Sequence, residues 1–467
     1  MLTKILIANR GEIAIRIMDA CKDLDLDYIA VYTETDKDSE HVRRNTVSGP
    51  EQNCWRIASY TDPNELFAVA DHTGCTAIHP GYGLFSENYR FARRAATRER
   101  PITFIGPNWE VLRDLGNKMN TRRIANTLGI PTITGSNAPV YNEMEAEHVG
   151  VRLLETQREN GIDVPSILIK PAAGGGGMGI EKATDVKQIR KGYRRLQSYA
   201  KRQLGDGGIV MEQFLPDCNL LEVHLLCSAY GERLHFGTSN CTIQSSNHQK
   251  RIAAAPGFDK TCFKYDFDEK KLIDQIVDYS LKMAEYTNYD SAGSWEWLVS
   301  SSGHPYLLEV NTRIQVESDV CARTSYIDGM HPNLVREQIR LALGQRIGYD
   351  QSMVKFQGAA IALRIIAEDT NQDFLPWIGT ITDFNYSNHS WAAVYSHVPG
   401  DRPYPTPSDY DPNLLLTVVW GDSMDDAKEK AVRFIKELVL RGKDSSDNSI
   451  VTNIDYLKDN LDRLLAF

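Results

Sequence analysis

The first hundred residues alternate between two hydrophobic periods. Short apolar runs at Lys4–Ala8 and Tyr28–Thr33 are typical of buried strands. Between them, Glu12–Leu24 repeats apolar side chains at helical spacing. Because strands that alternate with helices usually form parallel sheets with right-handed crossovers, this segment predicts an α/β domain built on a parallel sheet.

The middle of the chain predicts two helices, at Arg122–Leu128 and Glu143–Asn160, followed by a short strand that ends at Lys170. Four consecutive glycines, Gly174–Gly177, come next, and another strand is expected near Met211. Glycines are unfavourable inside a helix or strand, but they can bring backbone N–H groups close to a phosphate. A flexible linker has the same composition, and the Gly-Lys-Ser/Thr ending of a Walker A loop is absent.

The densest group of polar side chains is Glu-Val-Asn-Thr-Arg-Ile-Gln-Val-Glu, residues 309–317. The apolar positions before it predict a buried strand, and a strand continuing to Glu317 would place alternate polar or charged side chains on one face. Burying several charges is costly unless they bind a metal, a partner charge or a substrate. The segment therefore predicts an active-site strand, and a solvated edge strand with scattered ion pairs is the alternative.

Composition sets broad limits. A chain of 467 residues is long enough for two or three domains, and 42% hydrophobic with 24% charged residues is ordinary for a soluble globular protein. The balance of 52 basic and 62 acidic residues argues against a nucleic acid or an anionic membrane as the main partner. The eight cysteines are scattered, which predicts neither a zinc site nor a disulfide framework.

Cellular location and cofactor class follow from similar arguments. The apolar run at the start is too short for a signal peptide, and other apolar runs are far shorter than a bilayer span. Together with free cysteines, this predicts a cytoplasmic protein. The first turn, Asn-Arg-Gly-Glu-Ile-Ala, has one glycine and is not a dinucleotide fingerprint, which disfavours a nicotinamide or flavin cofactor.

Several motifs resemble, in order and spacing, those of biotin carboxylases, the ATP-grasp enzymes that carboxylate biotin on its carrier. They are ILIANRGEIAIRI, HPGYG, FIGP, ILIKPAAGGGGMGI, MEQFL, NCTIQSSNHQK, WEWL, EVNTRIQVE and ALRIIAED. The likeness covers nearly the whole chain. It implies an α/β fold in three parts: an N-terminal parallel-sheet domain over residues 1–115, an ATP-grasp domain over 116–350 with a mobile glycine-rich lid at about 135–210, and a C-terminal α+β domain over 351–467.

The resemblance also implies the nucleotide ligands. Lys118 and Lys170 match the lysines that contact the ATP phosphates. Glu212 matches the acid that accepts from the adenine amino group, with the backbone through Leu215 reading the ring edge. The other implied ATP-binding residues are Gly175, Gly176, Gly177, Gln244 and His248.

A magnesium (or manganese) site is implied by the same resemblance. Glu296 and Glu309 match the carboxylates that hold the metal, with Asn311 beside them. Oxygen ligands that are few and shared with phosphates suit Mg²⁺. Two facing carboxylates would also repel unless a cation lay between them.

For the chemistry, the resemblance implies that ATP first converts bicarbonate to carboxyphosphate. Glu317 matches the general base that takes the bicarbonate proton, and Lys250 matches a lysine near the phosphates and bicarbonate. Arg313 would also stabilise the enolate form of the biotin ureido group, because fixed donors stabilise developing charge. The implied substrate-binding residues are Arg313, Gln315, Val316 and Arg364. Taken alone, Arg364 could instead form a structural ion pair with Glu368 or Asp369.

Some positions depart from the family pattern. Met178 stands where the glycine loop usually continues into an arginine, and Ser245-Ser246 stands where an arginine pair is usual. Ser318-Asp319 replaces the family's His-Pro, and an insertion of about five residues runs through Ser325–Asn333. These changes remove peripheral positive charges but keep the catalytic acids. The lid's affinity for nucleotide, the dimer contact and the position of His248 can therefore differ from those of the family.

The resemblance implies partners as well. The chain has no Met-Lys-Met biotinylation site, so a separate biotin carboxyl carrier protein and a carboxyltransferase subunit are expected, with the chain itself a homodimer. The final acceptor stays open, with acetyl-CoA and propionyl-CoA as examples. Two alternatives are another ATP-grasp ligase that makes a different acyl-phosphate, and a non-catalytic scaffold paralogue. The Arg313-x-Gln315-x-Glu317 pattern weighs against the first, and retention of Glu317 and Lys250 weighs against the second.

Overall fold

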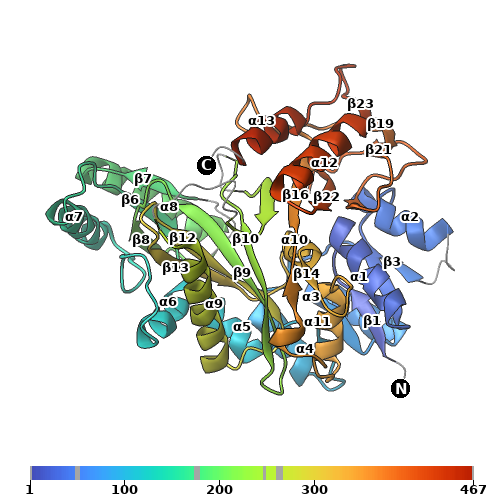
Figure 1. Ribbon diagram of the computed structural model, residues 1–467, viewed down its shortest axis with the longest axis horizontal. Helices are drawn as coiled ribbons and strands as arrows, with labels where there is room; N and C mark the ends of the chain where they lie inside the picture. The colour runs from blue at the N-terminus through green and yellow to red at the C-terminus, as the bar shows by residue number, and fades with distance from the viewer. Residues whose placement is uncertain are drawn as a thin grey trace.

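The structure is a computed structural model that describes residues 3–47, 53–172, 179–203, 205–245, 249–258 and 267–464. An 8-stranded antiparallel sheet forms its centre. An N-terminal domain lies at one side of this sheet and a smaller helix-and-sheet unit stands out at the other (Figure 1). Within the described residues, no helix is long and apolar enough to cross a membrane.

The N-terminal domain contains the predicted parallel sheet, in the order β3-β2-β1-β4-β5. Its strands are β1 (Lys4–Ile7), β2 (Asp27–Tyr32), β3 (Cys54–Arg56), β4 (Ala77–His79) and β5 (Thr103–Phe104). Its helices are α1 (Gly11–Asp23), α2 (Glu40–Val47), α3 (Pro63–Thr73), α4 (Tyr89–Thr97) and α5 (Trp109–Leu115). The expected strand–helix–strand opening is confirmed, because its apolar spacing is a local property of the chain.

Two buried histidines hold the start of α1, which has no side-chain cap of its own. His41 Nδ1 accepts from the backbone N–H of Gly11 at 3.3 Å, and His397 Nε2 accepts from that of Glu12 at 3.3 Å. Gly11 has φ +62°, and a Cβ there would lie 1.9 Å from His397 Cε1. Burial lowers the pKa of His41 to about 4 and that of His397 to about 3. Both rings are therefore neutral in the folded protein at pH 7.

Acid should destabilise the protein through these two rings. In the unfolded chain each histidine regains a pKa near 6.5 and binds a proton that it does not bind in the folded protein. The free energy of unfolding therefore falls as pH drops from about 6.5 towards 4. We expect about 2 kcal/mol per histidine between pH 7 and pH 5. Denaturant titrations at both pH values measure this loss. His41→Asn keeps an acceptor that cannot be protonated, and an unchanged pH dependence in that variant would contradict the assignment.

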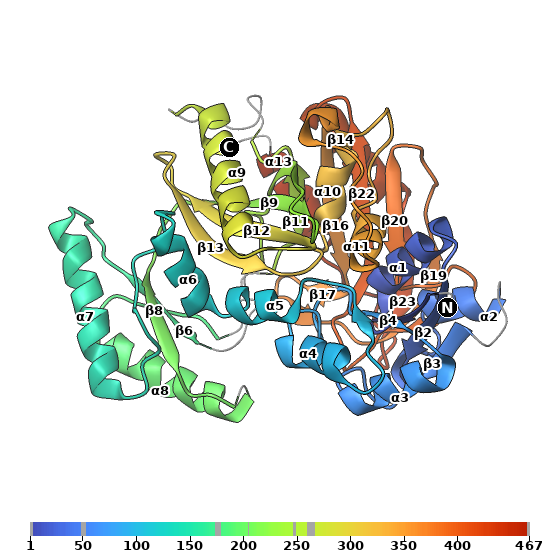
Figure 2. The ribbon, with the colours of Figure 1, turned by 90° about the horizontal axis from the view of Figure 1, so that it is seen from below.

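The unit that stands apart contains a 3-stranded sheet in the order β7-β6-β8. Its strands are β6 (Ile167–Pro171), β7 (Glu181–Ala183) and β8 (Ile209–Gln213). Helices α7 (Glu143–Glu159) and α8 (Val186–Gln203) lie beside it (Figure 2). Its buried apolar side chains form a separate core. Helix α6 (Lys118–Thr127) lies between this unit and the central sheet (Figure 2).

The central sheet has the order β13-β12-β9-β10-β11-β16-β22-β20. Its strands are β9 (Asn219–Cys227), β10 (Arg233–Asn240), β11 (Ile252–Ala255), β12 (Ala292–Val299), β13 (Pro305–Asn311), β16 (Ala359–Ile366), β20 (Ala392–Ser396) and β22 (Asn413–Gly421). The helices around it are α9 (Glu269–Tyr286), α10 (Ser318–Arg323), α11 (Leu334–Ala342), α12 (Met424–Glu437) and α13 (Ile454–Leu464). Pairing of β11 with β16 makes the central and C-terminal segments one sheet.

Short elements complete the described chain. They are the 3-10 helices at Glu34–Asp36 and Gln351–Met353 and the strands β14 (Ser325–Tyr326), β15 (Lys355–Phe356), β17 (Glu368–Asp369), β18 (Leu375–Pro376), β19 (Thr380–Asn385), β21 (Tyr404–Pro405) and β23 (Val439–Lys443).

The prediction that the active-site strand continues to Glu317 was wrong. Strand β13 ends at Asn311, and Glu317 is the N-cap residue of α10. Asn311 pairs with Ser294, and β12, the strand beside β13 in the sheet that the structure describes, begins two residues earlier at Ala292. Because β12 has only two further residues with which β13 could pair, a strand that continues to Glu317 has no partner there, and the chain presents its polar groups from a turn.

Candidate active site

Three glutamates lie side by side across three neighbouring strands of the central sheet. Glu296 of β12 pairs in register with Glu222 of β9 and with Glu309 of β13. Glu222 is fully buried, and Glu296 is nearly so. Like charges directly opposite one another destabilise a sheet, so this row of acids requires cations beside it.

Lys250 supplies part of that positive charge. Its Nζ contacts the Glu222 carboxylate and lies 2.7 Å from Glu296 Oε1. Burial alone would lower the pKa of Lys250, but Glu222 and Glu296 raise it well above its usual value. Burial raises the pKa of Glu296, and Lys250 only partly opposes that effect. The ammonium group thus holds two strands together at the centre of the site.

The implied metal ligands lie at the open end of this row. Asn311 Nδ2 donates to Glu296 Oε1 at 2.7 Å, and Lys118 Nζ lies 3.4 Å from Glu309 Oε2. Among the described residues, no group of three or more His, Cys, Asp or Glu could hold a metal ion by itself. Two carboxylates and one amide do fit Mg²⁺, which commonly takes one or two carboxylates and completes its shell with phosphate oxygens and water.

The turn after β13 brings the other predicted residues to the same place. Arg313 donates to Gln315 Oε1 at 2.9 Å and to Asn311 Oδ1 at 3.1 Å. Gln315 Nε2 donates to Ser294 Oγ at 3.0 Å. Val316 is buried within the turn. The predicted carboxylate, amide and guanidinium groups therefore converge, although they do not share the face of one strand.

Glu317 and Arg364 form an ion pair at the bottom of this site. Arg364 of β16 donates from Nη2 to Glu317 Oε1. Burial raises the pKa of Glu317, but Arg364 and Lys250 outweigh it and hold that pKa below its usual value. The alternative that Arg364 pairs with Glu368 was wrong, because Arg251 takes both oxygens of Glu368, each at 2.7 Å.

Two polar atoms of this pair have no hydrogen-bond partner. Within the described residues, Glu317 Oε2 and Arg364 Nε are both buried and unbonded. Leaving a buried charged group without its hydrogen bonds is costly, so such atoms in a folded protein need an explanation. An unfilled acceptor next to an unfilled donor suits a small molecule that carries both a proton and an anionic oxygen.

Two predicted nucleotide residues, Lys170 and Glu212, form an ion pair, which Arg122 joins. Lys170 Nζ lies 2.7 Å from Glu212 Oε2, and Arg122 Nη2 lies 2.7 Å from Glu212 Oε1. Burial raises the pKa of Glu212, but Lys170 and Arg122 outweigh it and hold that pKa low. Because both oxygens already accept, an adenine amino group would share one of them. Leu215 lies two residues beyond the end of β8.

Gln244 forms a backbone bridge with Lys250, and its side chain donates to the carbonyl oxygen of Cys241 at 3.3 Å. Other residues named from the sequence lie outside the described residues. They are Gly175, Gly176, Gly177, Met178, Ser246, Asn247 and His248.

Sequence reasoning missed several residues that the fold brings to the site. Glu222 was detectable, since it is the single acid in the mainly apolar strand β9. Glu87 lies 3.6 Å from Arg313, and Arg122 holds Glu212. Tyr82 donates to the buried Glu12, and Arg16 of the same N-terminal domain donates to the carbonyl oxygen of Val316, so this domain also reaches the site. Nothing in the local pattern singles out these last residues, because their partners are distant in sequence.

Three family models match the chain in succession. Residues 1–112 match the N-terminal domain of biotin carboxylase, 117–349 the ATP-binding domain of the carbamoyl-phosphate synthase L chain, and 362–463 the biotin carboxylase C-terminal domain. The chain belongs to the biotin carboxylase family. As a family member it is an ATP-dependent ligase that carboxylates biotin.

Individual relatives agree over nearly the whole chain. A biotin carboxylase from Nostoc sp. is 33% identical over 461 residues, which is 98% of this chain and 97% of the relative. The 2-oxoglutarate carboxylase small subunit of Hydrogenobacter thermophilus is 32% identical over 426 residues, covering 90% of this chain and 83% of the relative.

Solved biotin carboxylase structures share the fold. One is the biotin carboxylase domain dimer of the Hydrogenobacter thermophilus 2-oxoglutarate carboxylase with MgADP, ADP and bicarbonate, with TM-score 0.86 and 29% identity over 99% of this chain and 94% of that one. A Campylobacter jejuni biotin carboxylase nucleotide complex has TM-score 0.84 and 30% identity, covering 99% of this chain and 95% of that one.

Proposed function

We propose that Glu317, Arg364 and the turn Arg313–Val316 form the bicarbonate and biotin site of this biotin carboxylase. The observation that carries the proposal is the buried pair with the unbonded atoms Glu317 Oε2 and Arg364 Nε. In this assignment Glu317 Oε2 accepts the bicarbonate proton while a bicarbonate oxygen attacks the terminal phosphorus of ATP. The bond from that phosphorus to the bridging oxygen breaks, ADP leaves, and carboxyphosphate forms. Arg313, Gln315 and Arg364 hold the anion through directed N–H donors.

The ion pair also adjusts the basicity of Glu317. A carboxylate whose pKa is held low by Arg364 is a weak base. When Arg364 turns towards substrate, Glu317 loses its largest stabilising charge and binds a proton more tightly. Arg364 thereby links arrival of the anion to activation of the base.

On the nucleotide side, we assign Lys118, Lys170 and Glu212 to ATP, and Glu296, Glu309 and Asn311 to magnesium. A bound Mg²⁺ would neutralise phosphate charge and relieve the repulsion between Glu296 and Glu309. Lys250 keeps Glu222 and Glu296 in place beside the terminal phosphate.

The wider assignments are proposals as well. We propose domains at 1–115, 116–350 and 351–467, which lie close to the family-model matches at 1–112, 117–349 and 362–463. We also propose a cytoplasmic homodimer that works with a biotin carboxyl carrier protein and a carboxyltransferase subunit. A dimer is described for the similar Hydrogenobacter domain.

The proposed function is tested by ATP hydrolysis of the purified chain with and without bicarbonate and free biotin. We expect hydrolysis that depends on bicarbonate and is stimulated by biotin. Stimulation by an amine acceptor in place of biotin would indicate a different ATP-grasp ligase. No hydrolysis under any of these conditions would indicate a scaffold paralogue.

Removal of a metal ligand should be distinguishable from removal of an anion ligand. Glu296→Ala or Glu309→Ala should raise the magnesium concentration needed for half-maximal ATP cleavage, because each loses an oxygen that would bind the ion. Arg364→Ala should raise the KM for bicarbonate and leave the magnesium requirement unchanged. Magnesium titrations at saturating ATP measure both effects. Rescue of Arg364→Ala by magnesium would show that these roles are assigned wrongly.

A further inference from the structure

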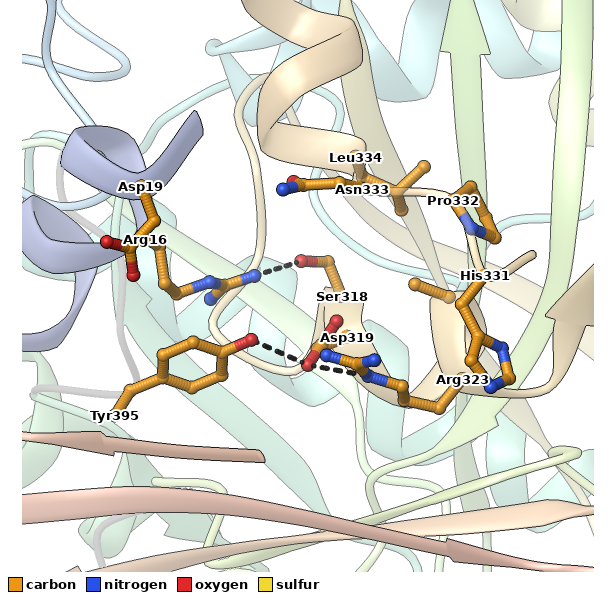
Figure 3. A pocket seen from close by; sticks show the side chains of 11 residues that line it. Arg16, Asp19, Ser318, Asp319, Arg323, His331, Pro332, Asn333, Leu334 and Tyr395 are labelled. Atoms are coloured by element: carbon orange, nitrogen blue, oxygen red, sulfur yellow. Dashed lines mark hydrogen bonds and ion pairs between the residues drawn. The ribbon is translucent and has the colours of Figure 1, made fainter. Parts of the chain in front are cut away.

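The N-terminal domain contacts the segment that carries Glu317: Arg16 bonds to Ser318, the next residue along the chain (Figure 3). Arg16 of α1 donates from Nη1 to the carbonyl oxygen of Val316 at 3.2 Å and from Nη2 to Ser318 Oγ at 3.0 Å. Arg16 is buried and lies 3.7 Å from Glu12. Its two contacts fall on the residues immediately before and after Glu317.

The C-terminal segment contacts Asp319, which lies in the first turn of α10. Tyr395 of β20 donates from its hydroxyl to Asp319 Oδ2 at 3.0 Å, and Arg323 Nε approaches the same oxygen at 3.3 Å (Figure 3). Asp319 is 8% exposed. The guanidinium of Arg16 lies 5.3 Å from the centre of the Tyr395 ring. The two attachments therefore form one connected network.

The network lines a cavity of about 210 Å³, which His331–Asn333 from the inserted loop also border. On the other side of the turn, Ile314, Val316 and Val320 are buried in an apolar core. The hydrogen bonds of Arg16 and Tyr395 therefore add a directed restraint on the cavity side to the packing on the core side.

Backbone hydrogen bonds also hold the turn, from Ser318 N–H to the Gln315 carbonyl oxygen at 3.3 Å and from Val320 N–H to the Glu317 carbonyl oxygen at 3.0 Å. The side chains of Ser318 and Asp319, at the start of α10, add bonds to α1 and β20. The polar network thus joins this turn to two other elements of the fold.

We propose that Asp319 and Tyr395 are positioning residues that orient Glu317 towards bicarbonate without contacting any substrate. The proposal rests on the base role proposed above for Glu317. Small displacements of a catalytic group lower the rate of the chemical step, while binding of ATP and bicarbonate depends on other side chains. Loss of the network should thus lower kcat and leave substrate binding intact.

The test compares Tyr395→Phe, Asp319→Asn and the double variant with the full-length wild type. We expect kcat for bicarbonate-dependent ATP cleavage to fall about tenfold in Asp319→Asn and somewhat less in Tyr395→Phe. The KM for bicarbonate and the Kd for ATP should stay unchanged. The double variant should be no slower than Asp319→Asn, because the two groups act through one bond.

Tyr28→Phe is the matched control. Tyr28 is buried in β2 and donates to Asn45 Oδ1 at 3.0 Å, so this variant removes the same hydroxyl and one hydrogen bond far from Glu317. Its kcat should equal that of the wild type. If Asp319→Asn does not fold, Tyr395→Phe decides the question, since it removes a single oxygen.

Two results would overturn the inference. One is a wild-type kcat in Tyr395→Phe and Asp319→Asn. The other is a parallel loss of kcat, KM, ATP affinity and melting temperature, which would indicate a purely structural role. An inactive wild-type protein is a different outcome, because it overturns the proposed function itself.

Discussion

Replacement of Glu317 with glutamine should slow biotin carboxylation by about 10²–10⁴-fold, the usual cost of losing a general base. Glutamine has nearly the same shape and can still accept from Arg364, but it cannot take a proton from bicarbonate. ATP affinity should be nearly unchanged, since Glu317 bonds to Arg364 and not to the proposed nucleotide residues. Carboxybiotin formation and titration calorimetry with ATP measure the two quantities.

Glu337→Gln provides the control for loss of a buried carboxylate. Glu337 of α11 is 2% exposed and pairs with Arg336 and Arg340. This variant loses the same charge from a similar environment outside the site. Equal carboxylation rates for Glu317→Gln and the wild type would exclude the base role, whereas equal losses in both glutamine variants would point to destabilisation.

Lys250→Met should abolish ATP cleavage and also destabilise the fold. Its removal leaves Glu222 and Glu296 opposite one another in the sheet without their shared cation. Breaking a buried ion pair by deleting one partner typically costs about 3–5 kcal/mol of unfolding free energy. Denaturant titration measures the loss of stability, and phosphate release measures the loss of activity.

The double variant Lys250→Met, Glu222→Gln separates these two effects. Neutralising Glu222 removes the acid-to-acid repulsion, so most of the lost stability should return. Activity should not return, because the ammonium group near the phosphates is still missing. Recovery of activity in the double variant would show that Lys250 serves only to balance Glu222.

The parts of the fold that could be predicted from the sequence are those set by local pattern. Strand, helix and strand at the N-terminus follow from apolar spacing within about thirty residues, and the structure places them as expected. The end of β13 could not be predicted in this way. It depends on how β13 is paired with β12, a contact between separate segments that local spacing does not specify.

In the site, too, the residues could be predicted from the sequence but their contacts could not. Glu317 and Arg364 could be named from motifs, but their contact joins residues on separate elements and required the fold. The pairing of Arg251 with Glu368 shows the limit of reasoning from nearby charges. Arg364 has Glu368 four residues away, yet β16 ends at Ile366 and Glu368 bonds to an arginine preceding β11 instead.

The continuous central sheet determines which parts of the molecule unfold together. Side chains from β9, β12, β16 and β22 share one apolar core, so the C-terminal segment cannot leave without exposing β11 as a bare edge. The unit built on β6 and β8 has its own separate core. In hydrogen exchange, the central and C-terminal strands should therefore open as one cooperative unit, and the smaller unit should open at lower free energy by itself.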